Sequence, residues 1–153
     1  MRILVINGPN MNLLGLRQPE IYGHRTYQDL LNLLTAEAET LHIDIKFYQS
    51  NHEGDLVDAI QKAYFDGVDG IILNPAAYTH TSVALLDALK AVSIPTVEVH
   101  LSDPDSREDF RLISYVRSAC IATCKGRGFQ SYLDALHLLA ERAMSNPTEK
   151  RPK

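Results

Sequence analysis

A group of side chains able to do acid–base chemistry lies between residues 7 and 23, directly after an apolar run. Residues 2–6 are Arg-Ile-Leu-Val-Ile, a pattern typical of a buried strand, and the segment that follows carries Asn10, Arg17 and Tyr22. In proteins that alternate strands with helices, ligands bind in the loops beyond the carboxyl ends of the strands. Residues 7–23 are therefore predicted to form part of an active site.

Tyr22 is the candidate general base of this segment. The reference pKa of tyrosine is about 10, but nearby guanidinium groups favour the phenolate. Arg17, Arg107 and Arg111 could supply that positive field, and glycines on both sides of the loop permit a lid movement. Taken alone, Tyr22 is better explained as a half-buried aromatic with its hydroxyl group in water, and it is the arginines, amides and histidine predicted nearby that favour the base.

Glu98 and His100 form a second candidate pair. They lie two residues apart at the end of an apolar run, so that a strand would place them on one face, poorly hydrated and in need of partners. In a functional interpretation, Glu98 orients His100, which donates a proton as a general acid. An ion pair with only a structural role at a strand end explains the two residues equally well.

Polar residues follow the first four strand-like runs, which places them around one crevice. They are Asn7, Asn10, Asn12, Arg17 and Tyr22; Gln49, Ser50, Asn51, His52 and Glu53; Asn74, Tyr78, Thr79 and His80; and Glu98, His100, Ser102, Arg107 and Arg111. His80 opens a predicted helix, where Thr81 or a neighbour is expected to act as the N-cap.

The elements that must position these residues alternate regularly. Strand-like runs recur at 3–6, 43–48, 70–73, 96–99 and 120–124, and helical spacing is found at 26–41, 54–65, 81–92 and 129–144. This alternation predicts right-handed crossovers and a parallel sheet covered on both faces. At this length, the expected fold is an α/β three-layer flavodoxin-like sandwich with a five-stranded parallel sheet in the order 2-1-3-4-5, since a (β/α)8 barrel needs roughly 250 residues. Thr26 is expected to cap the first long helix.

Length and composition point to one globular domain. The 153 residues are 45% hydrophobic and contain no repeat, which predicts a single catalytic domain at 1–144 and a flexible, proline-broken tail at 145–153. The net charge of −4 and the scattered Lys and Arg residues argue against a nucleic-acid partner. Without a run of eighteen apolar residues or a leader-like beginning, a soluble cytoplasmic protein is expected.

Cofactor and metal motifs do not match. No G-x-G-x-x-G follows the first strand and no Walker sequence occurs, while Gly126-Arg127-Gly128 is interpreted as the turn into the last helix. Cys120 and Cys124 are expected on one face of a strand, about 13 Å apart and too distant to bridge. His and Cys spacing does not indicate a zinc site. Neither a metal nor a cofactor is predicted.

Several motifs in register resemble the type II 3-dehydroquinate dehydratases over residues 2–140. They are Asn-Gly-Pro-Asn at 7–10, Asn-Leu-Leu-Gly at 12–15, Arg17, Pro19, Tyr-Gly at 22–23, Gln-Ser-Asn at 49–51, Asn74, Tyr-Thr-His-Thr-Ser at 78–82, Glu-Val-His-Leu-Ser at 98–102 and Arg-Glu-x-Phe-Arg at 107–111. The resemblance implies a cofactor-free anti elimination of water from 3-dehydroquinate through an enolate to 3-dehydroshikimate, a step of the shikimate pathway to chorismate and aromatic amino acids and of quinate breakdown.

The resemblance also implies roles for individual residues. Tyr22 would accept the proton next to the ketone, and Arg17 would stabilise the transition state. Asn10, through a bound water, would hold the enolate oxygen, while His100, paired with Glu98, would protonate the departing hydroxyl. Substrate contacts are implied for Asn74, His80, Asp87, Leu101, Ser102, Arg107 and Arg111. Asp87 would reach the site of a neighbouring subunit in a homododecamer of trimers.

Four positions depart from the family's common pattern: Leu86 where a basic residue is expected, Asp103 for Asn, Ile113 for His, and Arg127 for an apolar or aromatic residue. Two other functions remain open from the residues. A related module could bind a small carboxylate without turning it over, although binding needs neither Tyr22 nor His100. An imine-forming dehydratase would need a lysine in a dry pocket. Lys125 is the one lysine near the crevice, and it is interpreted as a surface residue beside the last helix.

Overall fold

The structure is a computed structural model that describes residues 1–16, 20 and 24–145. The predicted base Tyr22, the predicted transition-state stabiliser Arg17 and the tail at 146–153 lie outside the described residues. Ser145, predicted to begin the tail, is instead the last residue of the final helix, because the helical hydrogen bonding continues one residue beyond the apolar pattern.

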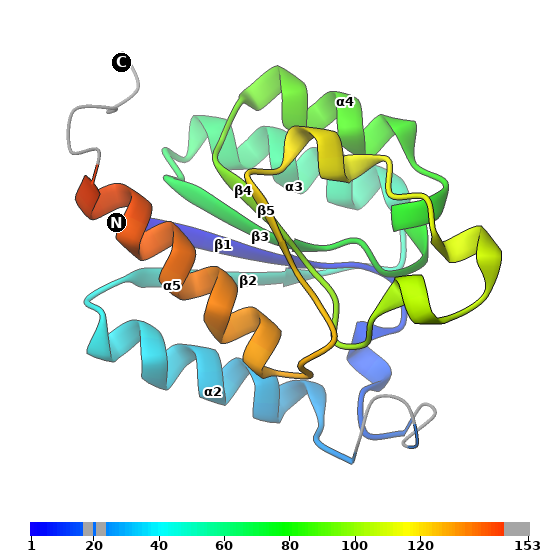
Figure 1. Ribbon diagram of the computed structural model, residues 1–153. Helices are drawn as coiled ribbons and strands as arrows, with labels where there is room; N and C mark the ends of the chain where they lie inside the picture. The colour runs from blue at the N-terminus through cyan, green and yellow to red at the C-terminus, as the bar shows by residue number, and fades with distance from the viewer. Residues whose placement is uncertain (17–19, 21–23, 146–153) are drawn as a thin grey trace.

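Five parallel strands form one sheet in the order β2-β1-β3-β4-β5, as predicted (Figure 1). Their bounds are Arg2–Asn7 for β1, Asp44–Gln49 for β2, Gly70–Asn74 for β3, Thr96–Val99 for β4 and Ala122–Cys124 for β5. The register pairs Asn7 with both Gln49 and Asn74, and Glu98 with Thr123. All the polar strand ends therefore meet at one edge.

Four long helices alternate with the strands: α2 at Tyr27–Thr40, α3 at Glu53–Phe65, α4 at Val83–Val92 and α5 at Gln130–Ser145. Thr26 caps α2 as predicted: its Oγ1 accepts from the Asp29 amide, and its own amide donates to Asp29 Oδ2 in a capping box. The N-cap of α4 is Ser82, whose Oγ accepts from the Leu85 amide at 3.0 Å. None of the four helices in the described ranges is long and apolar enough to cross a membrane.

The sheet separates two apolar cores, which makes the three-layer sandwich visible in Figure 1. One face packs on α2 and α5 through residues such as Val5, Leu34 and Leu136, all fully buried. The other face packs on α3 and α4 through Ile60, Leu85 and their neighbours. Burying both faces explains why the central strands β1, β3 and β4 are nearly continuous in apolar residues.

The last strand is shorter than predicted. The apolar run at 120–124 forms a strand only from Ala122, because the Cys120 amide still donates to the Arg117 carbonyl of the 3-10 turn Val116–Ala119. Cys120 packs against the α3–α4 core and Cys124 against the α2–α5 core. The expectation that both cysteines share one face is therefore wrong, although both are free thiols.

Candidate active site

A pocket lies beyond the carboxyl ends of β1, β3 and β4, where the sequence placed the crevice. It is lined by Pro9, Asn10, Met11, Leu14, Asn74, Ala76, Ala77, His80, His100, Leu101, Ser102, Pro104, Arg107 and Arg111. The structure thus brings together eight of the predicted site residues, with Glu98 directly behind His100. The loops fold here because parallel strands all end at the same edge of the sheet.

Glu98 and His100 form a hydrogen-bonded pair at the end of β4. His100 Nε2 donates to Glu98 Oε1 at 2.7 Å, with Glu98 fully buried and His100 only 6% exposed. A carboxylate only accepts, so the Nε2 proton is held on that side of the ring. A proton passed to a ligand must therefore leave from Nδ1.

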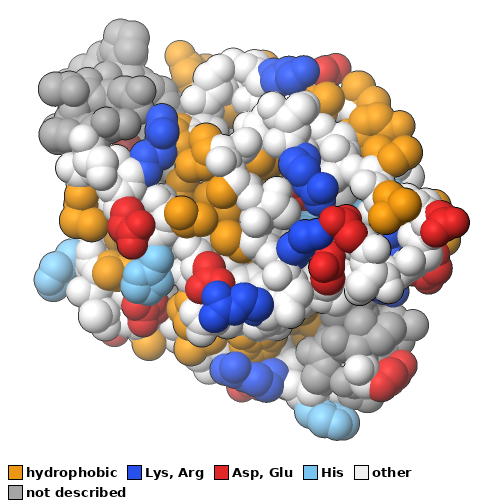
Figure 2. Space-filling view, viewed as in Figure 1, with side chains coloured by type: hydrophobic (Ala, Val, Ile, Leu, Met, Phe, Trp, Pro, Cys, Tyr) orange, Lys and Arg blue, Asp and Glu red, His pale blue; other side chains and the backbone are white. Residues whose placement is uncertain are grey.

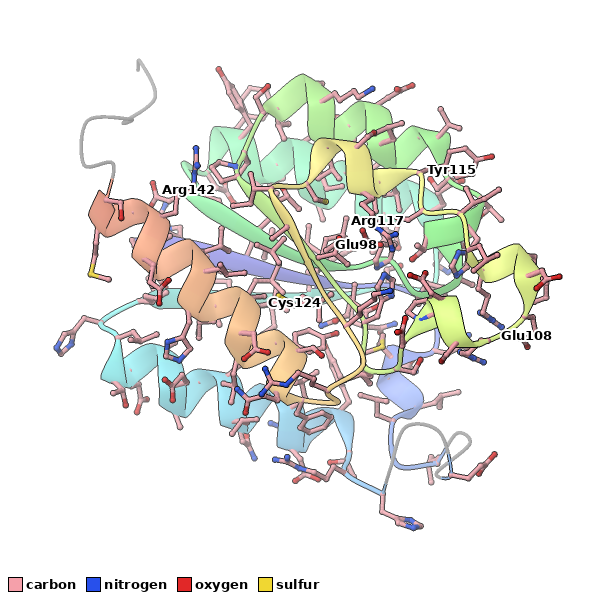
Figure 3. All side chains as sticks on the ribbon, in the orientation of Figure 1. Glu98, Glu108, Tyr115, Arg117, Cys124 and Arg142 are labelled. Atoms are coloured by element: carbon pink, nitrogen blue, oxygen red, sulfur yellow. The ribbon has the colours of Figure 1, made fainter. Side chains whose placement is uncertain are left out.

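Three residues that sequence reasoning missed surround Glu98. Ser114 Oγ donates to Oε1 at 2.8 Å, Thr123 Oγ1 to Oε2 at 3.1 Å, and Arg117 Nε to Oε2 at 3.3 Å. Figure 3 shows Arg117, which belongs to the 3-10 turn Val116–Ala119, next to Glu98. Thr123 could have been found from the register of two adjacent parallel strands; Ser114 and Arg117 come from irregular segments without a periodic signal.

These partners keep Glu98 ionised despite its burial. Burial by itself raises the pKa of Glu98, but the hydrogen bond and positive charge of His100, together with Ser114 and Arg117, lower that pKa to about 2. A permanent negative charge at this position stabilises the protonated imidazole that general-acid chemistry requires.

His80 lines the same pocket. Its Nδ1 lies 2.7 Å from the carbonyl oxygen of Ile113, so that Nδ1 carries the proton. Burial lowers the pKa of His80, and the charges of Arg111 and His100 lower it further against the opposing effect of the Ile113 hydrogen bond. His80 is therefore neutral near pH 7, with Nε2 as an acceptor for a hydroxyl group.

Asn74 is held by a buried network that the sequence did not reveal. Its Nδ2 donates to the Tyr132 hydroxyl at 2.8 Å, and its Oδ1 accepts from the Ala76 amide at 3.1 Å. The Tyr132 hydroxyl in turn donates to Asn7 Oδ1 at 2.5 Å. Tyr132 lies on α5, whose apolar periodicity indicates packing but not a polar tip beneath the pocket.

Asn10 is fixed by its backbone. It has a left-handed conformation with φ of 68°, and its amide donates to Asn51 Oδ1 at 2.9 Å. Gly8 precedes it against the next loop, where a Cβ would lie 2.4 Å from the carbonyl oxygen of Pro75. The glycine thus allows the first and third strand ends to approach closely enough to share one pocket.

The turn after β4 offers main-chain donors. The carbonyl oxygens of Leu101 and Ser102 accept from the Gly128 and Gly126 amides at 2.9 and 3.2 Å. Because the peptide is trans, the Ser102 N–H points opposite to the Leu101 carbonyl. Among the residues that the structure describes, none accepts from the Leu101 or Ser102 amide, which leaves both available to a ligand.

Two arginines give the pocket positive charge. Arg111 Nε donates to Glu108 Oε2 at 2.7 Å, and Arg107 Nε lies 3.7 Å from the same oxygen. Their side chains are only 17% and 19% exposed for Arg107 and Arg111. Both guanidinium groups thus lie in the pocket lining, where they can attract an anionic ligand.

Two other residues from the sequence analysis lie outside the pocket. Asp87 is exposed on α4 and does not line it. Lys125 pairs with Asp103 and Asp105, whose hydrogen bonds raise its pKa. Imine formation needs a neutral amine in a dry pocket, so this environment is opposite to the one required. Within the described ranges, no group of three or more His, Cys, Asp or Glu side chains could hold a metal ion.

Comparisons with known proteins agree with this geometry. Residues 1–140 match the sequence model of the family Dehydroquinase class II. A 3-dehydroquinate dehydratase from Caldicellulosiruptor bescii is 51% identical over 140 residues, which cover 92% of this chain and 97% of the relative. One from Corynebacterium glutamicum is 50% identical over 139 residues, covering 91% and 95%.

Solved structures give the same result. The type II dehydroquinase from Butyrivibrio crossotus superimposes with a TM-score of 0.90 at 48% identity, covering 91% of this chain and 97% of that one. The enzyme from Propionibacterium acnes has a TM-score of 0.87 at 38% identity, covering 92% and 96%. With the pocket, its Glu98–His100 pair and these likenesses in agreement, the chain belongs to the class II dehydroquinase family.

Proposed function

We propose that this protein is a 3-dehydroquinate dehydratase that eliminates water from its substrate through an enolate to give 3-dehydroshikimate. The observation that carries the proposal is the buried Glu98–His100 pair beside a pocket with Arg107 and Arg111, in a chain of this family. The substrate is an anion with a ketone and a leaving hydroxyl group, so it needs positive charge, a base and an acid.

In this mechanism Tyr22 removes the proton beside the ketone, and Arg17 stabilises the phenolate and the developing charge. Asn10, through a bound water, holds the enolate oxygen, since preorganised donors can stabilise such a charge without a metal. His100 Nδ1 then gives its proton to the departing hydroxyl group, and Glu98 stabilises the imidazolium before the transfer. One proton leaves carbon and one reaches oxygen, so that water is the only other product.

We propose that the Leu101 and Ser102 amides and the Ser102 hydroxyl bind the substrate carboxylate. His80, Arg111 and Asn74 bind its hydroxyl groups, and Arg107 supports the lid that carries Tyr22. Asn74 has one amide hydrogen directed only at Met11 Sδ, 3.5 Å away. A thioether is a weak acceptor, so a hydroxyl group can replace it at little cost.

We also propose that the protein assembles into a dodecamer of trimers in which Asp87 reaches the site of a neighbouring subunit. Asp87 is exposed on α4. Large apolar side chains are also exposed along the segment that contains Arg111: Phe110, Leu112, Ile113 and Tyr115. Such residues are typical of a surface that another subunit covers.

A direct assay tests the activity. Purified protein mixed with 3-dehydroquinate should produce the ultraviolet absorbance of a conjugated enone, and folded protein that gives no rise would exclude the dehydratase. Borohydride added with substrate should leave the activity intact, because an enolate mechanism forms no imine to reduce. Loss of activity under borohydride would instead indicate a Schiff base.

A further inference from the structure

Lys125 joins two parts of the chain at the edge of the pocket. It follows Cys124, which Figure 3 labels at the end of β5. Its Nζ lies 2.9 Å from Asp103 Oδ1 and also contacts Asp105 Oδ2, with the lysine side chain 27% exposed. The lysine thus connects β5 to the turn that follows β4.

The same turn carries the main-chain donors of the pocket. Leu101, Ser102 and Pro104 line the pocket, while the side chain of Asp103 lies outside its lining. Asp103 Oδ1 also accepts from the Asp105 amide at 3.0 Å and caps the short 3-10 turn Pro104–Ser106. Displacing Asp103 would therefore change the direction of the adjacent Ser102 amide.

The turn also creates an electrostatic difficulty. Two carboxylates, Asp103 and Asp105, lie within four residues of the amides proposed to bind the substrate carboxylate. The hydrogen bond from Lys125 lowers the pKa of Asp103, which keeps that group charged. Without an adjacent cation, two negative charges next to an anion site would weaken anion binding.

We propose that Lys125 is a positioning residue for the substrate carboxylate, because it holds the 101–106 turn and offsets the charge of Asp103 and Asp105. This inference rests on the proposed function, since it assigns the Leu101 and Ser102 amides to a carboxylate. Lys125 does not touch substrate itself and acts through the turn.

The test compares Lys125→Met, which keeps the length of the side chain without its charge, with Lys125→Arg and with the double variant Lys125→Met/Asp103→Asn. Lys125→Met should raise the KM for 3-dehydroquinate about tenfold and leave kcat within about twofold, since carboxylate binding weakens while the acid and base stay in place. Lys125→Arg should restore most of the affinity. The double variant should restore part of it, because asparagine still caps the turn without a charge.

Lys62→Met is the matched control, since Lys62 also pairs with an aspartate, Asp66, but on α3 away from the pocket. Its KM should equal that of the unmodified protein. An unchanged KM for Lys125→Met would overturn the proposal. If the KM of the double variant is no lower than that of Lys125→Met, Lys125 does not act by offsetting the charge of Asp103.

A second measurement does not depend on turnover. Hydrogen exchange of the peptide at 101–106 should be faster in Lys125→Met than in the unmodified protein, and unchanged in Lys62→Met. If the unmodified protein lacks dehydratase activity, the proposed function fails, while exchange still decides whether Lys125 holds the turn. Equal exchange in all variants would overturn that role.

Discussion

At the scale of single residues, the acid side of the site depends on how one buried carboxylate stays charged. Glu98 accepts hydrogen bonds from four side chains, of which His100 is the one that faces the pocket. An isolated carboxylate at this depth would become neutral. The surrounding hydrogen-bond donors keep Glu98 charged instead, and the charged carboxylate accepts a hydrogen bond from His100 Nε2.

Replacing Glu98 with glutamine tests this arrangement. Glu98→Gln should lower kcat about 100-fold, because the imidazolium loses its counter-charge while the ring keeps its place. The exposed Glu141→Gln on α5 is the matched control and should leave kcat unchanged. Equal kcat values for the two variants would show that proton donation by His100 does not depend on the charge of Glu98.

The same variant tests the stability that Glu98 contributes. Its pKa is lowered from the ordinary value of 4.5 to about 2 in the folded protein. This contribution is therefore full above about pH 4.5 and is lost as pH falls toward 2. Thermal unfolding of the unmodified protein should lose stability more steeply over this range than that of Glu98→Gln. Parallel curves would contradict the lowered pKa.

The base side of the site is tested by Tyr22→Phe. The variant should bind 3-dehydroshikimate with nearly unchanged affinity but turn substrate over slower by several powers of ten, because only the phenolic oxygen is removed. Product titration by calorimetry and the ultraviolet assay measure the two effects. An active phenylalanine variant would assign the base to another residue.

At the scale of elements, caps and buried polar links set the position of each strand end. Ser82 caps α4 and lies two residues after His80, which ends the 3-10 turn Ala76–His80 and lines the pocket. Tyr132 links α5 to β1 and β3 through Asn7 and Asn74. The pocket therefore depends on helices whose own residues contribute little to its lining.

Ser82 and Thr81 are neighbours with hydroxyl groups, and it is Ser82 that caps α4. Ser82→Ala should lower the free energy of unfolding by about 1 kcal/mol, because the Leu85 amide loses its acceptor. Thr81→Ala, one residue earlier and exposed, should change it by less than about 0.5 kcal/mol. Chemical denaturation of both variants gives the comparison, and the reverse order would make Thr81 the cap.

At the scale of the whole molecule, charged side chains of both signs are mixed, whereas several exposed apolar side chains follow one another along one segment. Lys and Arg alternate with Asp and Glu on the face seen in Figure 2, without a continuous basic surface. Apolar exposure recurs instead along the segment that includes Phe110, Leu112 and Ile113, which are 63%, 53% and 56% exposed. Subunit contacts are the physical explanation that we propose for this exposure.

Leu112→Glu tests that explanation. A charge in a covered apolar contact should dissociate the assembly into smaller species in sedimentation velocity, because its burial is unfavourable. Met144→Glu, 74% exposed at the end of α5, is the control and should leave the size unchanged. An unmodified protein that sediments as a monomer would contradict the dodecamer.

From the amino-acid sequence we could predict the order of strands and helices, the edge at which the polar residues meet, and the pairing of Glu98 with His100. These follow from apolar periodicity and from the rule that parallel strands end together, which are local or topological properties. The folded structure was needed to identify the groups that surround Glu98, the hydrogen bond between Asn74 and Tyr132, and the contacts of Lys125 with two aspartates. Those contacts join residues far apart in the chain. Some lie in irregular turns, and Tyr132 lies on α5, where apolar periodicity indicates packing but not the hydrogen-bond partner of a side chain.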